Sequence, residues 1–120
     1  MQKKTADQLR AETIAAFEER NEESRAELAR IEAGEISNLF VLRQDRGNIC
    51  IRINEIGQPR NVSPINATRY KWPGDARTVG LNIENGAGEN PRVIVVSQAL
   101  REDIETTEHL IATLRGLMGS

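Results

Sequence analysis

The chain is poor in the residues on which nucleophilic and metal chemistry depend. Its 120 residues include one cysteine, Cys50, and one histidine, His109. A single cysteine cannot form an intrachain disulfide, and a structural zinc site needs several Cys or His ligands. A catalytic nucleophile needs a neighbouring base, and His109 stands beside the apolar stripe of an expected helix, with no second histidine to form a dyad. We therefore predict that the protein is not an enzyme and uses no metal or other cofactor.

Long hydrophobic runs are also absent. A membrane-spanning helix needs about 20 apolar residues in succession, and no segment approaches this length. The first residues, MQKKTADQLRAETIAAF, lack the continuous apolar run of a signal peptide. With 38% hydrophobic and 28% charged residues, the composition is that of a globular rather than a disordered protein. We expect a cytoplasmic protein with one compact domain and an appendage, and no membrane partner.

Proline and glycine are missing between residues 5 and 33, where Ala, Glu, Arg and Leu dominate. These are strong helix formers, and Gly34 supplies a helix stop. Six residues recur at alternating spacings of three and four, the heptad pattern of a helix–helix seam. They are Ile14, Phe17, Asn21, Ser24, Leu28 and Ile31. We predict that residues 1–35 form a long amphipathic N-terminal helix that mediates self-association.

The charges beside this seam favour an antiparallel pair of helices from two copies. In a parallel pair, Arg20 would face Arg25 of the second copy, which is repulsive. In an antiparallel pair, Arg20 meets Glu27 and Glu18 meets Arg25, and both contacts are attractive. Exposed pairs of this kind select an orientation more than they supply affinity. The prediction is a homo-oligomer built on a homodimeric coiled coil. The alternative is that the helix packs on the sheet of its own chain.

Four apolar runs predict β-strands over residues 38–43, 48–54, 77–83 and 92–96. Short connections, the second of them the Gly-rich residues 84–91, join these runs into two hairpins. After Ser97, a good helix N-cap, apolar residues recur at helical spacing as far as Met118. The predicted fold class is α+β. Residues 36–120 form its small domain, with a four-stranded antiparallel sheet of two hairpins and a C-terminal helix packed on the sheet.

The only Trp and the only Tyr stand among cations in residues 69–77, RYKWPGDAR. This stretch closes a connection, residues 55–76, whose prolines stiffen it, and connections of that length are often functional. Lys and Arg hold phosphates, and aromatic rings stack on bases. We therefore predict a ligand-binding set of Arg60, Arg69, Tyr70, Lys71, Trp72 and Arg77. The alternative is that Tyr70 and Trp72 turn inward and anchor the loop.

These features together predict a non-enzymatic oligomeric binding module. Residues 37–96 hold eight Lys/Arg against five Asp/Glu, whereas both ends of the chain are acidic. The basic and aromatic loop suits an anionic ligand, either a nucleotide or a nucleotide-derived signal. A phage-type inhibitor that sequesters such a signal, or blocks a defence complex by direct contact, fits this description. The alternative is a structural or assembly protein that acts only through protein contacts. A nucleic-acid partner stays open, although the acidic ends argue against sequence-reading DNA binding.

Overall fold

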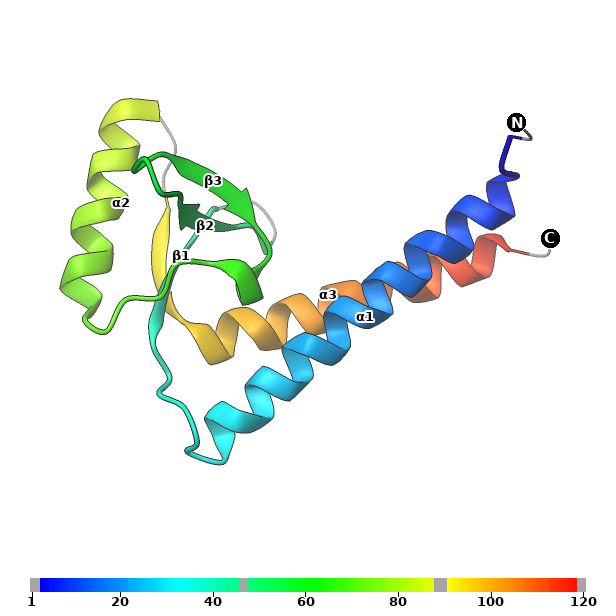
Figure 1. Cartoon of the computed structure of the whole chain (residues 1–120), viewed down its shortest axis with the longest axis horizontal. Coiled ribbons are helices and arrows are strands. Elements are labelled where there is room, and N and C mark those ends of the chain that lie inside the picture. The colour runs from blue at the N-terminus through cyan, green and yellow to red at the C-terminus, as the bar shows by residue number, and fades with distance from the viewer. Residues whose placement is uncertain (1–2, 46–47, 88–90, 119–120) are drawn as a thin grey trace.

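The computed structural model describes residues 3–45, 48–87 and 91–118. It confirms the α+β class, with a long helix at each end and a four-stranded antiparallel sheet between them (Figure 1). The α-helices are α1 (Ala6–Glu32), α2 (Pro73–Ala87) and α3 (Val96–Leu117), and a short 3₁₀ helix, η1, spans Pro64–Asn66. The strands are β1 (Phe40–Arg43), β2 (Cys50–Ile53), β3 (Pro59–Val62) and β4 (Arg92–Val95). No helix among the described residues is long and apolar enough to cross a membrane.

The sheet has the strand order β3-β2-β1-β4, with every neighbouring pair antiparallel. The strands β1 and β2 pair at Arg43 and Cys50 and then diverge. Residues 67–70 enter the gap between them. The Thr68 N–H donates to the Ile51 carbonyl at 3.2 Å, and Tyr70 exchanges backbone hydrogen bonds of 2.7 and 2.9 Å with Phe40. This short insertion fixes the point at which the chain leaves the sheet for α2.

The third predicted strand, residues 77–83, is wrong because these residues are helical and belong to α2. Their alternation of Val79, Leu81 and Ile83 fits a strand, but Leu81 is exposed in the helix. The buried positions Ala76, Gly80 and Ile83 instead follow helical spacing. A Cβ atom at Gly80 would lie 3.2 Å from the Leu42 side chain, so glycine permits this close approach of helix and strand.

The hairpin predicted between 77–83 and 92–96 is therefore also wrong. Part of its expected connection, residues 84–87, lies in α2, and residues 88–90 lie outside the described residues. The sheet is completed instead by β3, whose residues lie in the segment 55–76 that was expected to be a loop. Its hairpin with β2 turns at Gly57, where φ is 80°. Backbone N–H groups of Ile56 and Gln58 donate to the Asn54 side chain inside that turn.

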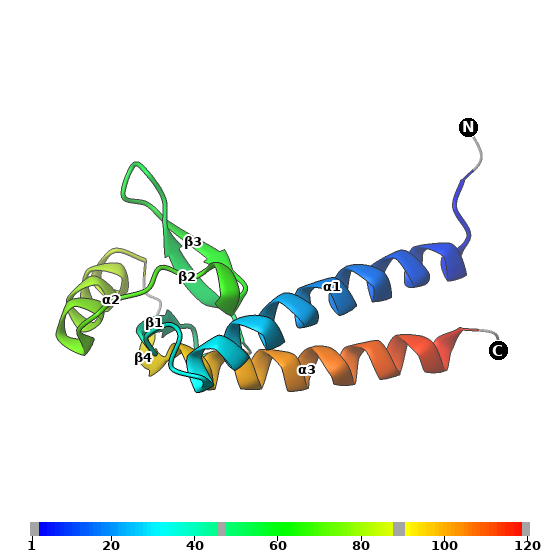
Figure 2. The same ribbon diagram turned by 60° about the horizontal axis from the view of Figure 1, so that its bottom comes forward.

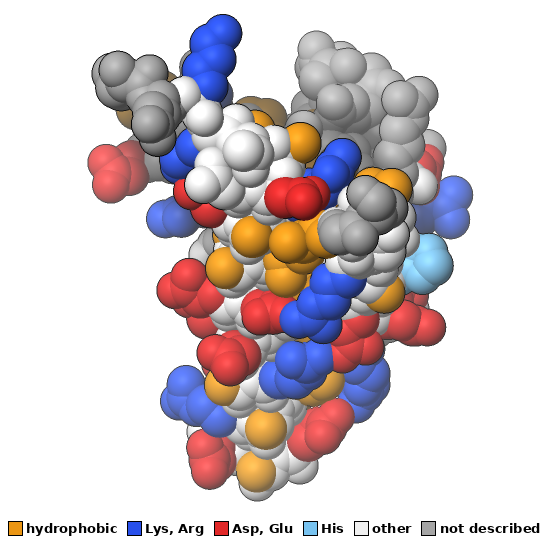
Figure 3. All heavy atoms as spheres, turned by 90° about the vertical axis from the view of Figure 1, so that its right-hand side faces the viewer, with side chains coloured by type: hydrophobic (Ala, Val, Ile, Leu, Met, Phe, Trp, Pro, Cys, Tyr) orange, Lys and Arg blue, Asp and Glu red, His pale blue; other side chains and the backbone are white. Residues whose placement is uncertain are grey.

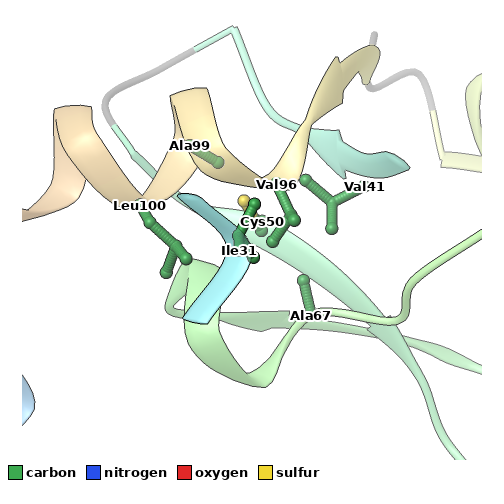
Figure 4. Packing of buried hydrophobic residues seen from close by; sticks show 7 residues of the cluster. All are labelled: Ile31, Val41, Cys50, Ala67, Val96, Ala99 and Leu100. Carbon is green, nitrogen blue, oxygen red and sulfur yellow. The ribbon is translucent and has the colours of Figure 1, made fainter. Parts of the chain in front are cut away.

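The two faces of the sheet are covered by different helices. The helix α2 packs on one face, over Leu42 and Ile51. The other face packs against the end of α1, the start of α3 and the residues after η1. Its core is Ile31, Val41, Cys50, Ala67, Val96, Ala99 and Leu100 (Figure 4). This arrangement confirms that the C-terminal helix packs on the sheet.

Beyond the sheet, α1 and α3 continue side by side as a two-helix arm (Figures 1 and 2). Antiparallel ion pairs cross the arm at Glu32–Arg101, Arg25–Glu108 and Glu18–Arg115. Successive pairs are seven residues apart on each helix, so the two helices meet in one heptad register. Seen from the tip of the arm, acidic and basic side chains interleave, with hydrophobic side chains between them (Figure 3).

The ends of the helices show how local sequence sets their limits. The α1 N-terminus carries a capping box of Thr5 and Gln8, and Gly34 follows its C-terminus with φ of 76°. The predicted N-cap at Ser97 is wrong because α3 already begins at Val96. The Asn38 side chain instead accepts a hydrogen bond from the Ser97 N–H at 3.1 Å and donates to the Ser97 hydroxyl at 2.8 Å. A residue before β1 thus satisfies the first turn of α3.

Candidate functional site

The structure divides the predicted ligand-binding stretch between the inside and the outside of the molecule. Arg69 forms an ion pair of 2.7 Å with Glu27 of α1, and both side chains are about one-fifth exposed. Tyr70 packs against the core beneath α2, where burial raises the pKa of its hydroxyl. Lys71 and Trp72 remain at the surface, with the Lys71 ammonium 5.5 Å from the centre of the Trp72 ring. The first two residues therefore anchor this segment, and the next two face solvent.

The other predicted ligand residues lie on different elements. Arg60 is exposed on β3, and Arg77 is exposed in the second turn of α2, the helix that follows Trp72. No contact joins Arg60 to Lys71, Trp72 or Arg77 among the interactions of the described residues. The six residues predicted as one loop site therefore do not form one cluster. They leave two separate surfaces, one at the start of α2 and one on the β2–β3 ladder.

The β2–β3 ladder carries an arginine pair that includes a residue missing from the sequence-based prediction. Arg52 on β2 lies directly opposite Arg60 on β3. Side chains directly opposite in an antiparallel pair share one face of the sheet and have Cβ atoms about 5 Å apart. Neither arginine forms an ion pair with any of the described residues, and both are exposed. Two like charges are thus held side by side without a protein counter-ion.

This arginine pair lines a surface depression of about 670 Å³, which we call the arginine pocket. Its wall also includes Ile56, which is 75% exposed in the β2–β3 turn, and Val62 at the end of β3. Glu55 lines the same pocket but pairs with neither arginine. In Figure 2 the β2–β3 turn extends away from the rest of the chain. The pocket is therefore open to a ligand and has two cations on one wall.

Arg52 was missed because its opposite strand lay inside an expected loop. The alternation of NICIRIN already placed Arg52 on the polar side of its strand. The signal that could have found β3 is the glycine of the stretch NEIG, since three to five residues containing glycine commonly close a hairpin. The three prolines of residues 55–76 favoured a loop instead. Pro59 is accommodated because it begins β3, which is an edge strand.

The seam predicted for self-association contacts α3 of the same chain. Ile14, Asn21, Ser24 and Ile31 are buried there, whereas Phe17 and Leu28 are half-buried. The flanking charges expected to pair between two copies are also used within the chain. Arg25 and Glu18 pair with Glu108 and Arg115. Self-association through this seam thus competes with α3, and oligomer formation by any surface stays a prediction.

A polar cluster lies within the arm. The Arg20 guanidinium donates to Asp103 Oδ1 at 2.8 Å and to the Thr107 hydroxyl at 2.9 Å. Asp103 is only 2% exposed, and burial raises the pKa of its carboxyl although the neighbouring Arg20 lowers it. Asn21 donates to the Ile104 carbonyl at 3.2 Å. The cluster pairs a buried carboxylate with a half-buried guanidinium, so its net charge is near zero.

Groups that could bind a metal ion do not gather in the described part of the chain. The Cys50 thiol is fully buried, and burial raises its pKa to about 12, so it stays protonated at neutral pH. Within residues 3–45, 48–87 and 91–118, no group of three His, Cys, Asp or Glu side chains could hold a metal ion. His109 is exposed on α3.

Comparison of the chain with protein-family models, with curated proteins and with solved structures found no match. The arginine pocket and its surroundings are therefore the features from which a function can be inferred.

Proposed function

We propose that the protein is a non-enzymatic binding module that takes a phosphate-bearing ligand in the arginine pocket. The observation that carries this proposal is the cross-strand pair of Arg52 and Arg60, which has no ion-pair partner among the described residues. Like charges directly opposite on a sheet are destabilising. A phosphate between the two guanidinium groups would turn that repulsion into attraction and could accept bidentate hydrogen bonds from each of them.

The pocket favours a small ligand over an extended polyanion. Its cations are confined to one cross-strand pair, whereas a backbone-tracking nucleic-acid groove needs a longer run of positive charge. The exposed Ile56 and the adjoining Val62 add an apolar margin beside the two cations. A phosphate ester with an organic group, such as a nucleotide or a nucleotide-derived signal, matches both the two cations and the apolar margin. Binding without turnover would sequester such a molecule.

Titration with inorganic pyrophosphate tests the phosphate site directly. We expect binding that weakens by about tenfold or more for Arg52→Ala and for Arg60→Ala, because each variant removes one charge-assisted contact. Arg77→Ala is the matched control, since Arg77 is also an exposed arginine but lies on α2, away from the β2–β3 ladder. Affinity should also fall as salt is raised. Equal affinities for all four proteins, or no binding by the wild type, would overturn the proposal.

A second candidate function is an assembly protein that acts only through protein contacts. The observation in its favour is the two-helix arm, where Leu9, Leu110 and Leu117 are between 42% and 52% exposed. Contiguous apolar patches mark protein interfaces, and a partner that lies along the arm could cover these three leucines together. Native mass spectrometry separates the two functions. A small molecule retained on the native protein and lost on denaturation supports the first, whereas a higher oligomer mass without a ligand supports the second.

A further inference from the structure

A second depression adjoins the arginine pocket. It has a volume of about 340 Å³ and lies where β3 and the residues before β2 meet α1 and α3; we call it the polar pocket. Val62 lines both pockets. Arg60 lies two residues before Val62 on the same strand, so the two side chains share one face and are about 7 Å apart along it. A single small molecule can therefore occupy both pockets at once.

The wall of the polar pocket offers hydrogen-bond donors and acceptors that the fold does not use. The Asn48 amide nitrogen donates to the Thr106 hydroxyl at 2.7 Å and to the Glu102 carbonyl at 2.9 Å. Its Oδ1 atom has no partner among the described residues and can accept. The Thr106 hydroxyl accepts that bond, so its hydrogen can be donated.

The floor of the polar pocket is the ion pair of Arg20 and Asp103. Since these two charges compensate each other, the pocket does not attract a second anionic group as the arginine pocket does. The Oδ2 atom of Asp103 is buried and has no hydrogen-bond partner among the described residues. A buried polar atom left unpaired costs stability.

One side of the polar pocket is apolar. Ile49, which is 43% exposed, and Val62 line it together with the amide and hydroxyl groups. A flat ring with polar edges suits such a lining, because its face can rest on aliphatic side chains while its edge forms hydrogen bonds. The polar pocket is thus matched to a neutral, hydrogen-bonding, ring-containing group rather than to a phosphate.

From this juxtaposition we infer that the ligand is a nucleoside diphosphate or a related nucleotide. Its phosphates lie between Arg52 and Arg60, and its sugar and base enter the polar pocket. The inference rests on the proposed function, because it names the class of molecule that the arginine pocket takes. It also separates the protein from a general phosphate or polyphosphate binder, for which the polar pocket would contribute nothing.

The test compares ligands that share the phosphates but differ in the nucleoside. Isothermal titration calorimetry of the full chain would measure the dissociation constants of pyrophosphate and of ADP, GDP, CDP and UDP. We expect at least one nucleotide to bind about tenfold or more tightly than pyrophosphate. The double variant Ser63→Ala with Thr106→Val should remove most of that difference and leave pyrophosphate binding unchanged, because both residues line the polar pocket and neither lines the arginine pocket.

Thr113→Val is the matched control, since Thr113 is an exposed threonine of the same helix that lies outside the pocket. This variant should bind every ligand like the wild type. Hydrogen–deuterium exchange provides a second measurement that needs no variant. The bound nucleotide should slow exchange of backbone amides at residues 48–49 and 61–63, whereas pyrophosphate should not.

The possible outcomes distinguish failure of the nucleoside inference from failure of the proposed phosphate-binding function. Nucleotides that all bind within threefold of pyrophosphate overturn the nucleoside inference and leave the phosphate site standing. A nucleotide preference that survives the double variant, without protection of residues 48–49 and 61–63, also overturns it, because the nucleoside then lies elsewhere. Failure of the wild type to bind either pyrophosphate or any nucleotide overturns the proposed function itself.

Discussion

Arg52 and Arg60 oppose each other across two strands and lack an ion-pair partner among the described residues, so this part of the sheet carries a local electrostatic cost. We therefore predict that removing this repulsion raises the stability of the fold and lowers its affinity for phosphate. Arg60→Glu should stabilise the fold by about 0.2–1 kcal/mol, because it replaces a repulsive cross-strand pair with an attractive one. The same change should abolish pyrophosphate binding. Urea denaturation and calorimetry on one preparation measure both effects.

The control for that prediction is Arg77→Glu, which changes the net charge equally on α2. It should leave both the free energy of unfolding and pyrophosphate binding close to the wild-type values. If Arg60→Glu destabilises the protein, the two arginines do not repel each other in solution, and the electrostatic basis for a phosphate site is lost.

The neighbouring aromatic residues Tyr70 and Trp72 should differ sharply in what they contribute to stability. Tyr70→Ala should destabilise the fold by about 3–5 kcal/mol, as deletion of a large packed side chain does; since Tyr70 is half-buried, we expect the lower end of this range. Trp72→Ala should change it by less than about 0.5 kcal/mol, because Trp72 is 61% exposed. Thermal denaturation measures both. Acrylamide should quench the fluorescence of Trp72 in the native state almost as well as in urea, and strong native-state protection would contradict the structure.

Asp103 should give the stability a specific pH dependence. Burial raises the pKa of its carboxyl above the ordinary value of 3.8, so the folded state holds this proton more tightly than the unfolded state. The contribution of Asp103 is therefore most favourable below pH 4 and declines as the pH rises through the raised folded pKa. Urea denaturation from pH 3 to 7 should show this decline in the wild type relative to Asp103→Asn. The opposite slope would mean that the attraction of Arg20 outweighs burial.

Cys50 should be unreactive in the folded protein. It is fully buried, so a reagent cannot reach the sulfur. Burial also raises its pKa to about 12, so the reactive thiolate does not form at neutral pH. A chromogenic disulfide reagent should label one thiol per chain in denaturant. In native buffer it should react only at the rate at which the core opens. Rapid native labelling would show that the core in Figure 4 is not closed around the sulfur.

The crossing pair of Arg25 and Glu108 offers a test of the arm by charge reversal. Both side chains are about half exposed, so Arg25→Glu should cost no more than about 1 kcal/mol. The double variant with Glu108→Arg should recover most of that loss, because the pair is restored with its signs exchanged. If Arg25→Glu instead lowers the mass of an oligomer without affecting the stability of the chain, this charge acts between copies.

Sequence reasoning succeeded where one periodic pattern had one interpretation. The long helix before Gly34, the strands near Phe40 and Cys50, and the C-terminal helix all follow from such patterns. It failed at residues 77–83, where the alternation of Val79, Leu81 and Ile83 favoured a strand although the buried positions follow helical spacing. Only the close approach at Gly80 to Leu42, a tertiary contact, decides between them. Local spacing could not have supplied that information.

The candidate site shows the same limit. Arg60 was found from its charge, but Arg52 becomes its neighbour only through the register of β2 and β3. Arg69 had the composition of a ligand residue, yet its contact with Glu27 joins segments 42 residues apart. The heptad seam predicts a helix interface, but sequence spacing does not say which helix occupies it. In the structure α3 of the same chain lies against it, and pairing with a second copy stays a prediction.

The alternating charges along the arm disfavour incorrect registers of α3 against α1. Sliding α3 by one heptad in one direction would bring Glu18 against Glu108, and sliding it in the other would bring Arg25 against Arg115. Either error places like charges at every crossing that remains. A slip of two heptads restores one attractive pair at the loss of two others. Like-charge contacts therefore destabilise the registers that lie one heptad away on either side. Each single ion pair, however, adds little to the stability of the native register.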